Sequence, residues 1–83
     1  MARIDPQLRA LLDGAPDLRL EAIVTASDSL DELLPELGCD VQVDHVYRLL
    51  RGVAVTATAA ALRRLAASSM VESIEPVRRV KHC

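Results

Sequence analysis

Residues 53–75 read VAVTATAAALRRLAASSMVESIE, and this stretch decides the fold because it predicts a strand, a helix and a strand in succession. Residues 53–57 are small and β-branched, which indicates a strand, and residues 71–75 indicate another. Between them the alanine-rich segment 59–67 favours a helix, with Thr58 as its N-cap residue. Leu62, Leu65 and Ala66 share one face of that helix.

A second unit of the same kind precedes it, starting with the strand predicted at residues 19–26 (RLEAIVTA). This segment is rich in apolar and β-branched residues, as a mostly buried strand requires. Ser29 and Glu32 then have the spacing of a capping box at the start of a helix. The leucines at helical spacing behind that box are Leu30, Leu33, Leu34 and Leu37. We expect Pro35 to kink or shorten the last turn and Gly38 to end the helix.

The next strand is expected over residues 41–50, and Arg51 and Gly52 then form a tight link to residues 53–57. The predicted order is strand, helix, strand, strand, helix, strand, which is a ferredoxin-like α+β sandwich. Right-handed crossovers place both helices on one face of a four-stranded antiparallel sheet. The opposite sheet face stays open, and a bare face on so small a domain indicates binding to a partner.

The N-terminus carries the signals of a further short helix. Asp5 supplies a capping acceptor, Pro6 follows where its missing N–H costs nothing, and Gly14 is an exit signal. The 83 residues are enough for one domain. We therefore expect a short helical arm over residues 1–17, the sandwich over residues 18–76 and an exposed tail over residues 77–83.

The composition favours a small binding domain. Hydrophobic residues make up 51% of the chain, but Tyr47 is the single aromatic residue, so Ala, Val and Leu must fill the core. The net charge of −2 provides no field that attracts nucleic acid or an anionic membrane. RNA-binding modules of this topology stack bases on aromatics, which are missing here. The basic residues expected on a solvated face are Arg48, Arg51, Arg63 and Arg64.

No segment predicts a membrane span or a signal peptide, so a cytoplasmic protein is expected if Met1 is the natural start.

No pattern predicts a catalytic residue, a metal site or a cofactor either. The soft metal ligands lack the spacing of a metal motif; they are Cys39, His45, His82 and Cys83. We expect free thiols, Cys39 at a strand entrance, and His45 on a strand facing solvent or the open sheet face.

Several short motifs occur in one order along residues 19–83. They are LEAIVTA, a Gly-x-x-Val opening at residues 38–41, Tyr47 before a short hairpin, GVAVTAT, an L-x-x-L helix at Leu62 and Leu65, and Val71-x-x-Ile74-Glu75. In this order the chain resembles the propeptides of subtilisin-type serine proteases and the small free-standing inhibitors related to them. Residues 4–9 (IDPQLR) also resemble the segment that precedes such domains.

The resemblance implies that the open sheet face packs on paired surface helices of a subtilisin-like serine protease, in cis or in trans. The tail would lie as an added strand in the substrate cleft, like a bound product. The tail residues implied to bind the protease are Val80, Lys81, His82 and Cys83. Glu75 matches an acidic position that caps exposed helix N-termini of the protease. The implied function is that of an inhibitor, of an intramolecular folding chaperone, or both.

Other functions stay open at this stage. The same sheet face or the edge strands would also suit a protein-protein interaction or homodimerisation module with no protease partner. A third hypothesis, a ferredoxin-like regulatory domain, requires a pocket for a small ligand. Within the first hypothesis, a permanent inhibitor should fold alone as a monomer, whereas a released prodomain can depend on its protease to become ordered.

Overall fold

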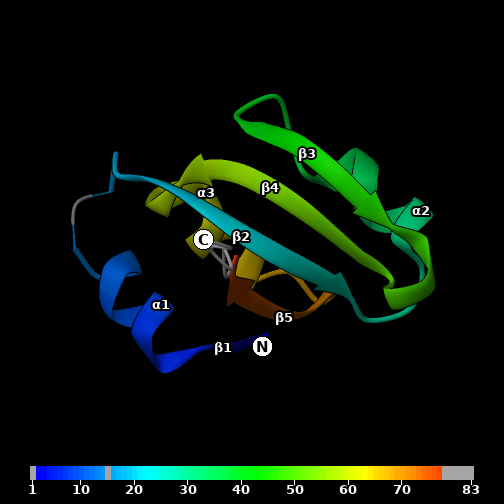
Figure 1. The fold of residues 1–83 in the computed structure, drawn as a ribbon, viewed down its shortest axis with the longest axis horizontal. Helices are drawn as coiled ribbons and strands as arrows, with labels where there is room; N and C mark the ends of the chain where they lie inside the picture. Colours follow the sequence, from blue (N-terminus) through cyan, green and yellow to red (C-terminus); the bar gives the residue numbers. More distant parts are fainter. Residues whose placement is uncertain (1, 15, 78–83) are drawn as a thin grey trace, which may run out of the picture.

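The computed structural model describes residues 2–14 and 16–77 of the chain. Within them it shows a mixed α+β fold with one five-stranded sheet and three α-helices (Figure 1). The strands are β1 (Arg3–Ile4), β2 (Arg19–Ala26), β3 (Val41–Tyr47), β4 (Gly52–Thr58) and β5 (Val71–Pro76). The helices are α1 (Pro6–Leu12), α2 (Leu30–Leu33) and α3 (Ala59–Ala66), together with the 3₁₀ turns η1 (Leu34–Glu36) and η2 (Arg48–Leu50).

The strands lie side by side in the order β1, β5, β2, β4, β3. The central strand β2 runs antiparallel to β4 and to β5, and β3 runs antiparallel to β4. The strand predicted at residues 19–26 is confirmed as β2. The strand predicted over residues 41–50 ends earlier, at Tyr47, because η2 and a left-handed Arg51 (φ 51°) form the turn into β4.

The predicted four-stranded antiparallel sheet is wrong in one respect, because β1 adds a fifth strand that runs parallel to β5. Arg3 pairs with Ser73, and Ile4 pairs with Ile74. The Asp5 N–H donates to the Ile74 carbonyl at 3.3 Å, which extends this pairing to the start of α1. A strand of two residues is too short to show an alternating pattern in the sequence.

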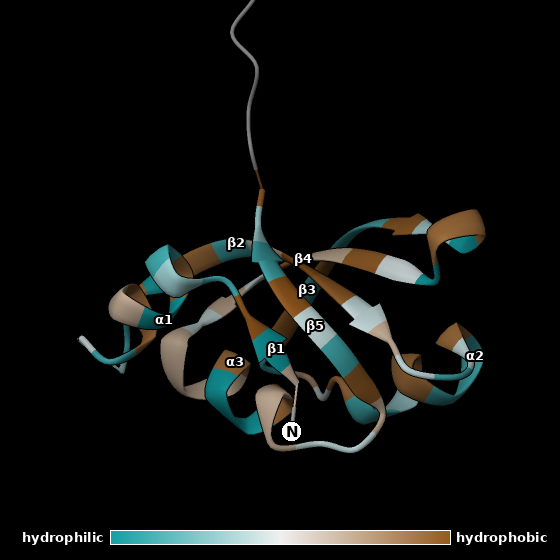
Figure 2. Ribbon diagram, turned by 90° about the horizontal axis from the view of Figure 1, so that it is seen from below, coloured by the Kyte–Doolittle hydropathy of each residue, from teal (hydrophilic) through white to brown (hydrophobic). Residues whose placement is uncertain are grey.

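Helices α2 and α3 cover one face of the sheet, and α1 packs beside α3 (Figure 2). The predicted caps of α1 and α3 are confirmed. The Asp5 carboxylate accepts hydrogen bonds from the N–H groups of Gln7 and Leu8. At α3 the Ala61 N–H donates to Thr58 Oγ1 at 3.2 Å. Both side chains satisfy N–H groups that have no partner within the helix.

The second predicted helix is short. α2 ends at Leu33 and continues as η1, which contains Pro35, so the expected shortening of the last turn is confirmed. The predicted capping box is wrong, because Ser29 makes no side-chain hydrogen bond at this N-terminus. Gly38 follows with a φ of +86°, in the left-handed region that glycine adopts without strain.

Arg64 links α3 to the turn before β3. Its Nη2 donates to the Leu37 carbonyl at 2.7 Å and to Asp40 Oδ1 at 2.9 Å. A Cβ atom on Gly38 would lie 2.9 Å from Asp40 Oδ1 and 3.1 Å from Arg64 Nη2, so a side chain there would disturb this link. Arg64 is exposed, as predicted for a solvated face, and its hydrogen bonds give it an additional structural role that was not predicted.

The core lies between the sheet and the helices. Its largest fully buried side chains are Leu8, Leu12, Val24, Leu33, Leu37, Val53, Val55, Leu62, Leu65 and Ile74. Ala22, Ala57 and Ala59 are completely buried between them. Because Leu8 and Leu12 belong to α1, the helix of the N-terminal segment is part of the same core as the strands.

Two adjacent leucines of α1 provide a test of this packing. Leu12 is 2% exposed and Leu11 is 47% exposed. We expect Leu12→Ala to lower the free energy of unfolding by about 2–5 kcal/mol, because it removes buried methyl groups and leaves a cavity. The matched variant Leu11→Ala should change it by less than about 0.5 kcal/mol. Urea denaturation followed by circular dichroism measures both. Equal effects of the two substitutions would contradict a structural role for α1.

Candidate functional site

One face of the sheet has no helix packed on it within residues 2–14 and 16–77 (Figure 2). Residues paired directly across neighbouring strands project their side chains to the same face. The register therefore places Glu75, Ile23, Ala54 and His45 in one row across β5, β2, β4 and β3. A neighbouring row on the same face consists of Glu21, Thr56 and Gln42. We call this surface the open face.

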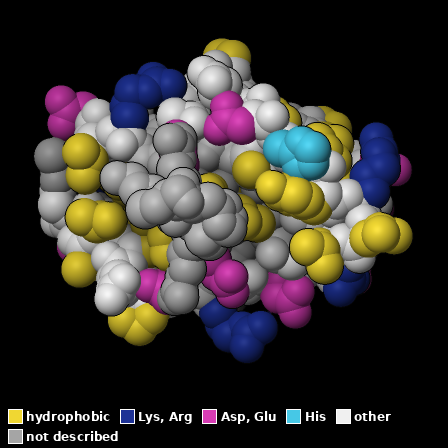
Figure 3. Space-filling view, in the orientation of Figure 1, with side chains coloured by type: hydrophobic (Ala, Val, Ile, Leu, Met, Phe, Trp, Pro, Cys, Tyr) yellow, Lys and Arg dark blue, Asp and Glu magenta, His cyan; other side chains and the backbone are white. Residues whose placement is uncertain are grey.

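The open face has a hollow of about 400 Å³ over β2, β3 and β4. It is lined by Glu21, Gln42, Asp44, His45, Tyr47, Ala54, Thr56 and Val77. The Val77 N–H donates to the Glu21 carbonyl at 3.4 Å, which continues the pairing of β5 with β2. The chain therefore leaves β5 at the border of this hollow. Seen from the open face, hydrophobic side chains gather beside a histidine (Figure 3).

Asp44 is held at the centre of a small polar network. Thr56 Oγ1 donates to Asp44 Oδ2 at 2.6 Å, and Gln42 Nε2 donates to Asp44 Oδ1 at 2.8 Å. The pairing of β3 with β4 shifts between Val43 and His45, so Asp44 lies in a bulge of the edge strand. A bulge changes the direction of a side chain. Here it directs the Asp44 carboxylate toward the hollow, where two donors hold it.

His45 and Tyr47 form an edge-on ring pair on the same strand, with ring centroids 4.4 Å apart and planes inclined by 60°. Tyr47 is 39% exposed, so much of its ring is available for contact. The prediction that His45 lies on a strand facing solvent or the open face is confirmed. Cys39 is an exposed free thiol in the turn that leads into β3, as predicted.

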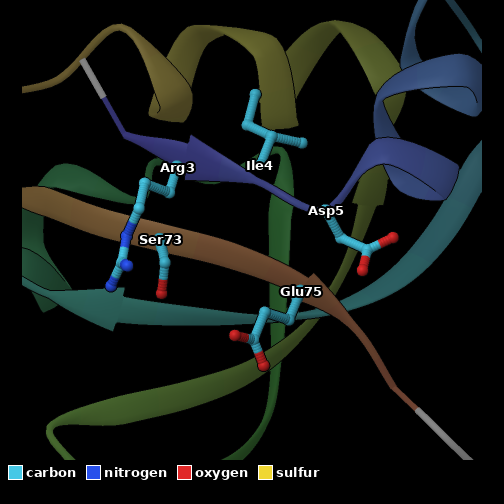
Figure 4. Close-up of a pocket in the computed structure, with 5 residues that line it drawn as sticks. All are labelled: Arg3, Ile4, Asp5, Ser73 and Glu75. Atoms are coloured by element: carbon cyan, nitrogen blue, oxygen red, sulfur yellow. The ribbon is translucent and has the colours of Figure 1, made fainter.

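Glu75 lies exposed near the end of β5, on the open face. A smaller hollow of about 220 Å³ is lined by Arg3, Ile4, Asp5, Ser73 and Glu75. Arg3, Ser73 and Glu75 lie on one side of β5, whereas Ile4 points to the other side, toward α3 (Figure 4). The Asp5 carboxylate caps α1. Glu75, Glu21 and Asp44 place three carboxylates on the open face, and the strand register places the guanidinium groups of Arg3 and Arg19 on the same face.

The structure places one of the predicted protease-binding residues, Glu75, on the open face. The other four lie outside the described residues: Val80, Lys81, His82 and Cys83. The sequence did not predict the polar network around Asp44. The alternation of residues 41–47 was visible, but a bulge within a strand leaves no distinct pattern in a single sequence.

The fold and the open face together define an α+β domain with one sheet face that no described helix covers and that carries both polar and apolar side chains. Among the described residues, no group of three His, Cys, Asp or Glu side chains is placed to hold a metal ion. In that same part of the chain, no helix is both long and apolar enough to cross a membrane. No model of a known protein family matches this chain, and no curated protein matches it significantly.

The hydrogen bonds around Asp44 should stabilise the edge strand β3 against local opening. In Thr56→Val the Asp44 carboxylate loses its closest donor, so the free energy of unfolding should fall by about 1 kcal/mol. Amide hydrogen exchange should become faster in β3 while β2 and β5 keep their protection. The control is Thr25→Val, which also replaces a threonine by valine on the open face but lies on β2, away from Asp44. Unaltered exchange in β3 would show that the network does not hold this strand.

Proposed function

We propose that this domain is an inhibitor of a subtilisin-like serine protease and, where it precedes such a protease, its folding chaperone. The open face docks on the protease, and residues 77–83 extend into the substrate cleft like a bound product. The observation that carries the proposal is the position of Val77. It lines the hollow on the open face, so a partner that covers this face also meets the start of the C-terminal segment.

The strand order supports the proposal. β5, β2, β4 and β3 are antiparallel neighbours in this order, and α2 and α3 connect the strands across one face. This order of four strands is compatible with the ferredoxin-like arrangement that the resemblance to subtilisin propeptides implies. β1 is an addition beside β5. It leaves the open faces of β2, β4 and β5 uncovered, so the proposed docking surface is compatible with the fifth strand.

The charge of the open face supports a contact with helix ends. The first N–H groups of a helix have no partner within the helix, and the helix dipole favours a negative charge beside them. Glu75 is an exposed carboxylate on β5, and Glu21 and Asp44 lie on the same face. A protease surface that presents helix N-termini would be complementary to the Glu75 carboxylate. Glu75 is the capping residue in this proposal.

The C-terminal segment supplies the inhibitory contact. An extended peptide in a substrate cleft binds through its backbone, while alternate side chains enter subsites. In the proposed complex Val80 enters the apolar subsite four residues before the cleavage point. Lys81 and His82 follow, and Cys83 occupies the primary specificity pocket beside the catalytic serine.

The sheet edges give less support to the alternative, a homodimer built by strand pairing. β3 is one edge of the sheet and is interrupted by the bulge at Asp44. The other edge is β1, which has two residues. Short and bulged edge strands are common devices against edge-to-edge association. Size measurement over a concentration series, with and without residues 80–83, distinguishes a dimer from an inhibitor.

Deletion of residues 80–83 tests the proposed inhibition. The full chain should inhibit subtilisin hydrolysis of a chromogenic peptide, and the truncated chain should inhibit at least about tenfold more weakly because the cleft contacts are lost. A circular-dichroism melt of both chains controls for folding. If several subtilisin-type proteases are equally unaffected by both chains, the proposal is wrong for those proteases.

Two glutamates of β5 allow a matched test of the docking face. Glu75 and Glu72 are both exposed, but Glu75 belongs to the open-face row through its pairing with Ile23, whereas Glu72 lies at the register shift between β5 and β2 and belongs to no such row. We expect Glu75→Gln to weaken inhibition about 3- to 10-fold, because a charge near helix N-termini is lost. Glu72→Gln should have no effect. The difference should shrink at high ionic strength, and equal inhibition constants at low salt would contradict the role of Glu75.

A further inference from the structure

Exposed hydrophobic side chains are concentrated in one segment of the described chain. The large ones are Leu11, Leu18, Val43, Tyr47, Leu49 and Leu50. Four of these six lie between residues 43 and 50, on β3 and η2. Leu49 is 100% exposed and Leu50 is 71% exposed. We call η2 with these two side chains the leucine turn.

The leucine turn is fixed to α2 at its start and to the loop before α2 at its end. At its start Arg48 forms an ion pair with Asp31 of α2, with 3.4 Å between Nη1 and Oδ1. At its end Arg51 Nη1 donates to the carbonyls of Ser27 (3.2 Å) and Asp28 (3.3 Å). The Arg51 carbonyl accepts from the Ala26 N–H at 2.8 Å. Exposed ion pairs contribute little, so the bonds to the backbone are the main restraint.

This restraint gives the leucine turn the properties of a binding anchor. A side chain that is presented on a fixed turn loses less conformational freedom when it is buried by a partner. Two guanidinium groups and two carboxylates line a hollow between the turn and the start of α2, those of Arg48, Arg51, Asp28 and Asp31. The two leucines do not line this hollow and are exposed. A surface that buries them must be apolar to gain from the contact.

The leucine turn also continues the open face. It follows Tyr47, which lines the hollow of that face, without an intervening residue. It stands on the side of the sheet away from the helices (Figure 2). A partner that covers the hollow would therefore also contact the leucine turn.

We propose that the leucine turn inserts Leu49 and Leu50 into an apolar pocket on the protease that the open face covers. This inference rests on the proposed function and adds a second anchor to it, at the connection of β3 to β4, whereas Glu75 lies on β5. The anchor selects among subtilisin-like proteases, because a protease with a polar surface at this position would leave two leucines in contact with polar groups.

The test compares two double variants that each replace two exposed leucines by a polar residue of similar size. Leu49→Gln/Leu50→Gln changes the leucine turn, and Leu11→Gln/Leu18→Gln changes α1 and the segment before β2. Inhibition of subtilisin is measured for the wild-type chain and both variants, with circular-dichroism melts as folding control. We expect the first variant to inhibit about 10- to 100-fold more weakly and the second to inhibit like the wild type.

Each result has a distinct meaning. Equal inhibition by the wild type and the leucine-turn variant would overturn the anchor and leave the proposed function intact. Equal weakening by both variants would also overturn it, since any exposed leucine would then matter. If the wild-type chain inhibits no subtilisin-type protease, the proposed function fails, and the anchor fails with it. A concentration-dependent dimer that only the leucine-turn variant abolishes in sedimentation experiments would assign the turn to a second copy of the chain.

Discussion

The structure depends on the packing of short helices against one face of a sheet whose core has no Phe or Trp. Because Ala22, Ala57 and Ala59 are completely buried, α3 can approach the sheet closely, and leucines from α1, α2 and α3 fill the remaining space. A chain of this size has too few apolar residues to build a second layer of the same kind. One face of the sheet is therefore packed, and the other is left to polar and half-buried side chains.

This one-sided core explains which parts of the fold could be predicted from the sequence. Segments that contribute to it have a periodic pattern, so β2, α3 and the caps at Asp5 and Thr58 were predicted at or close to their positions. β1 was missed because two residues carry no period, and its pairing with β5 becomes possible only once β5 is in place. The role of Arg64 was missed because its partners Leu37 and Asp40 lie 24 or more residues away.

The candidate site was less accessible to prediction than the core. The alternation of β3 indicated an open-face or solvent position for His45, but the row that joins it to Glu75 depends on the register of three strand pairs. Register is determined by turns and packing between distant segments. The apolar residues at positions 49 and 50 were assigned to a strand, whereas the structure places them in η2, where they are exposed. Apolar residues at these two positions fit a strand and a turn equally well, and the geometry of the turn after Tyr47 decides that they are exposed.

The edges of the sheet determine how a partner can bind. The described edges are the two-residue β1 and the bulged β3, so neither offers a long row of free backbone groups. A partner of the open face must therefore recognise side chains: carboxylates at Glu75, Glu21 and Asp44, aromatic rings at His45 and Tyr47, and leucines in η2. In the proposed complex, backbone recognition is left to the segment after Val77. Contact with the open face would then tune affinity and choice of partner, the C-terminal segment would enter the cleft, and mutations in the two regions should act independently.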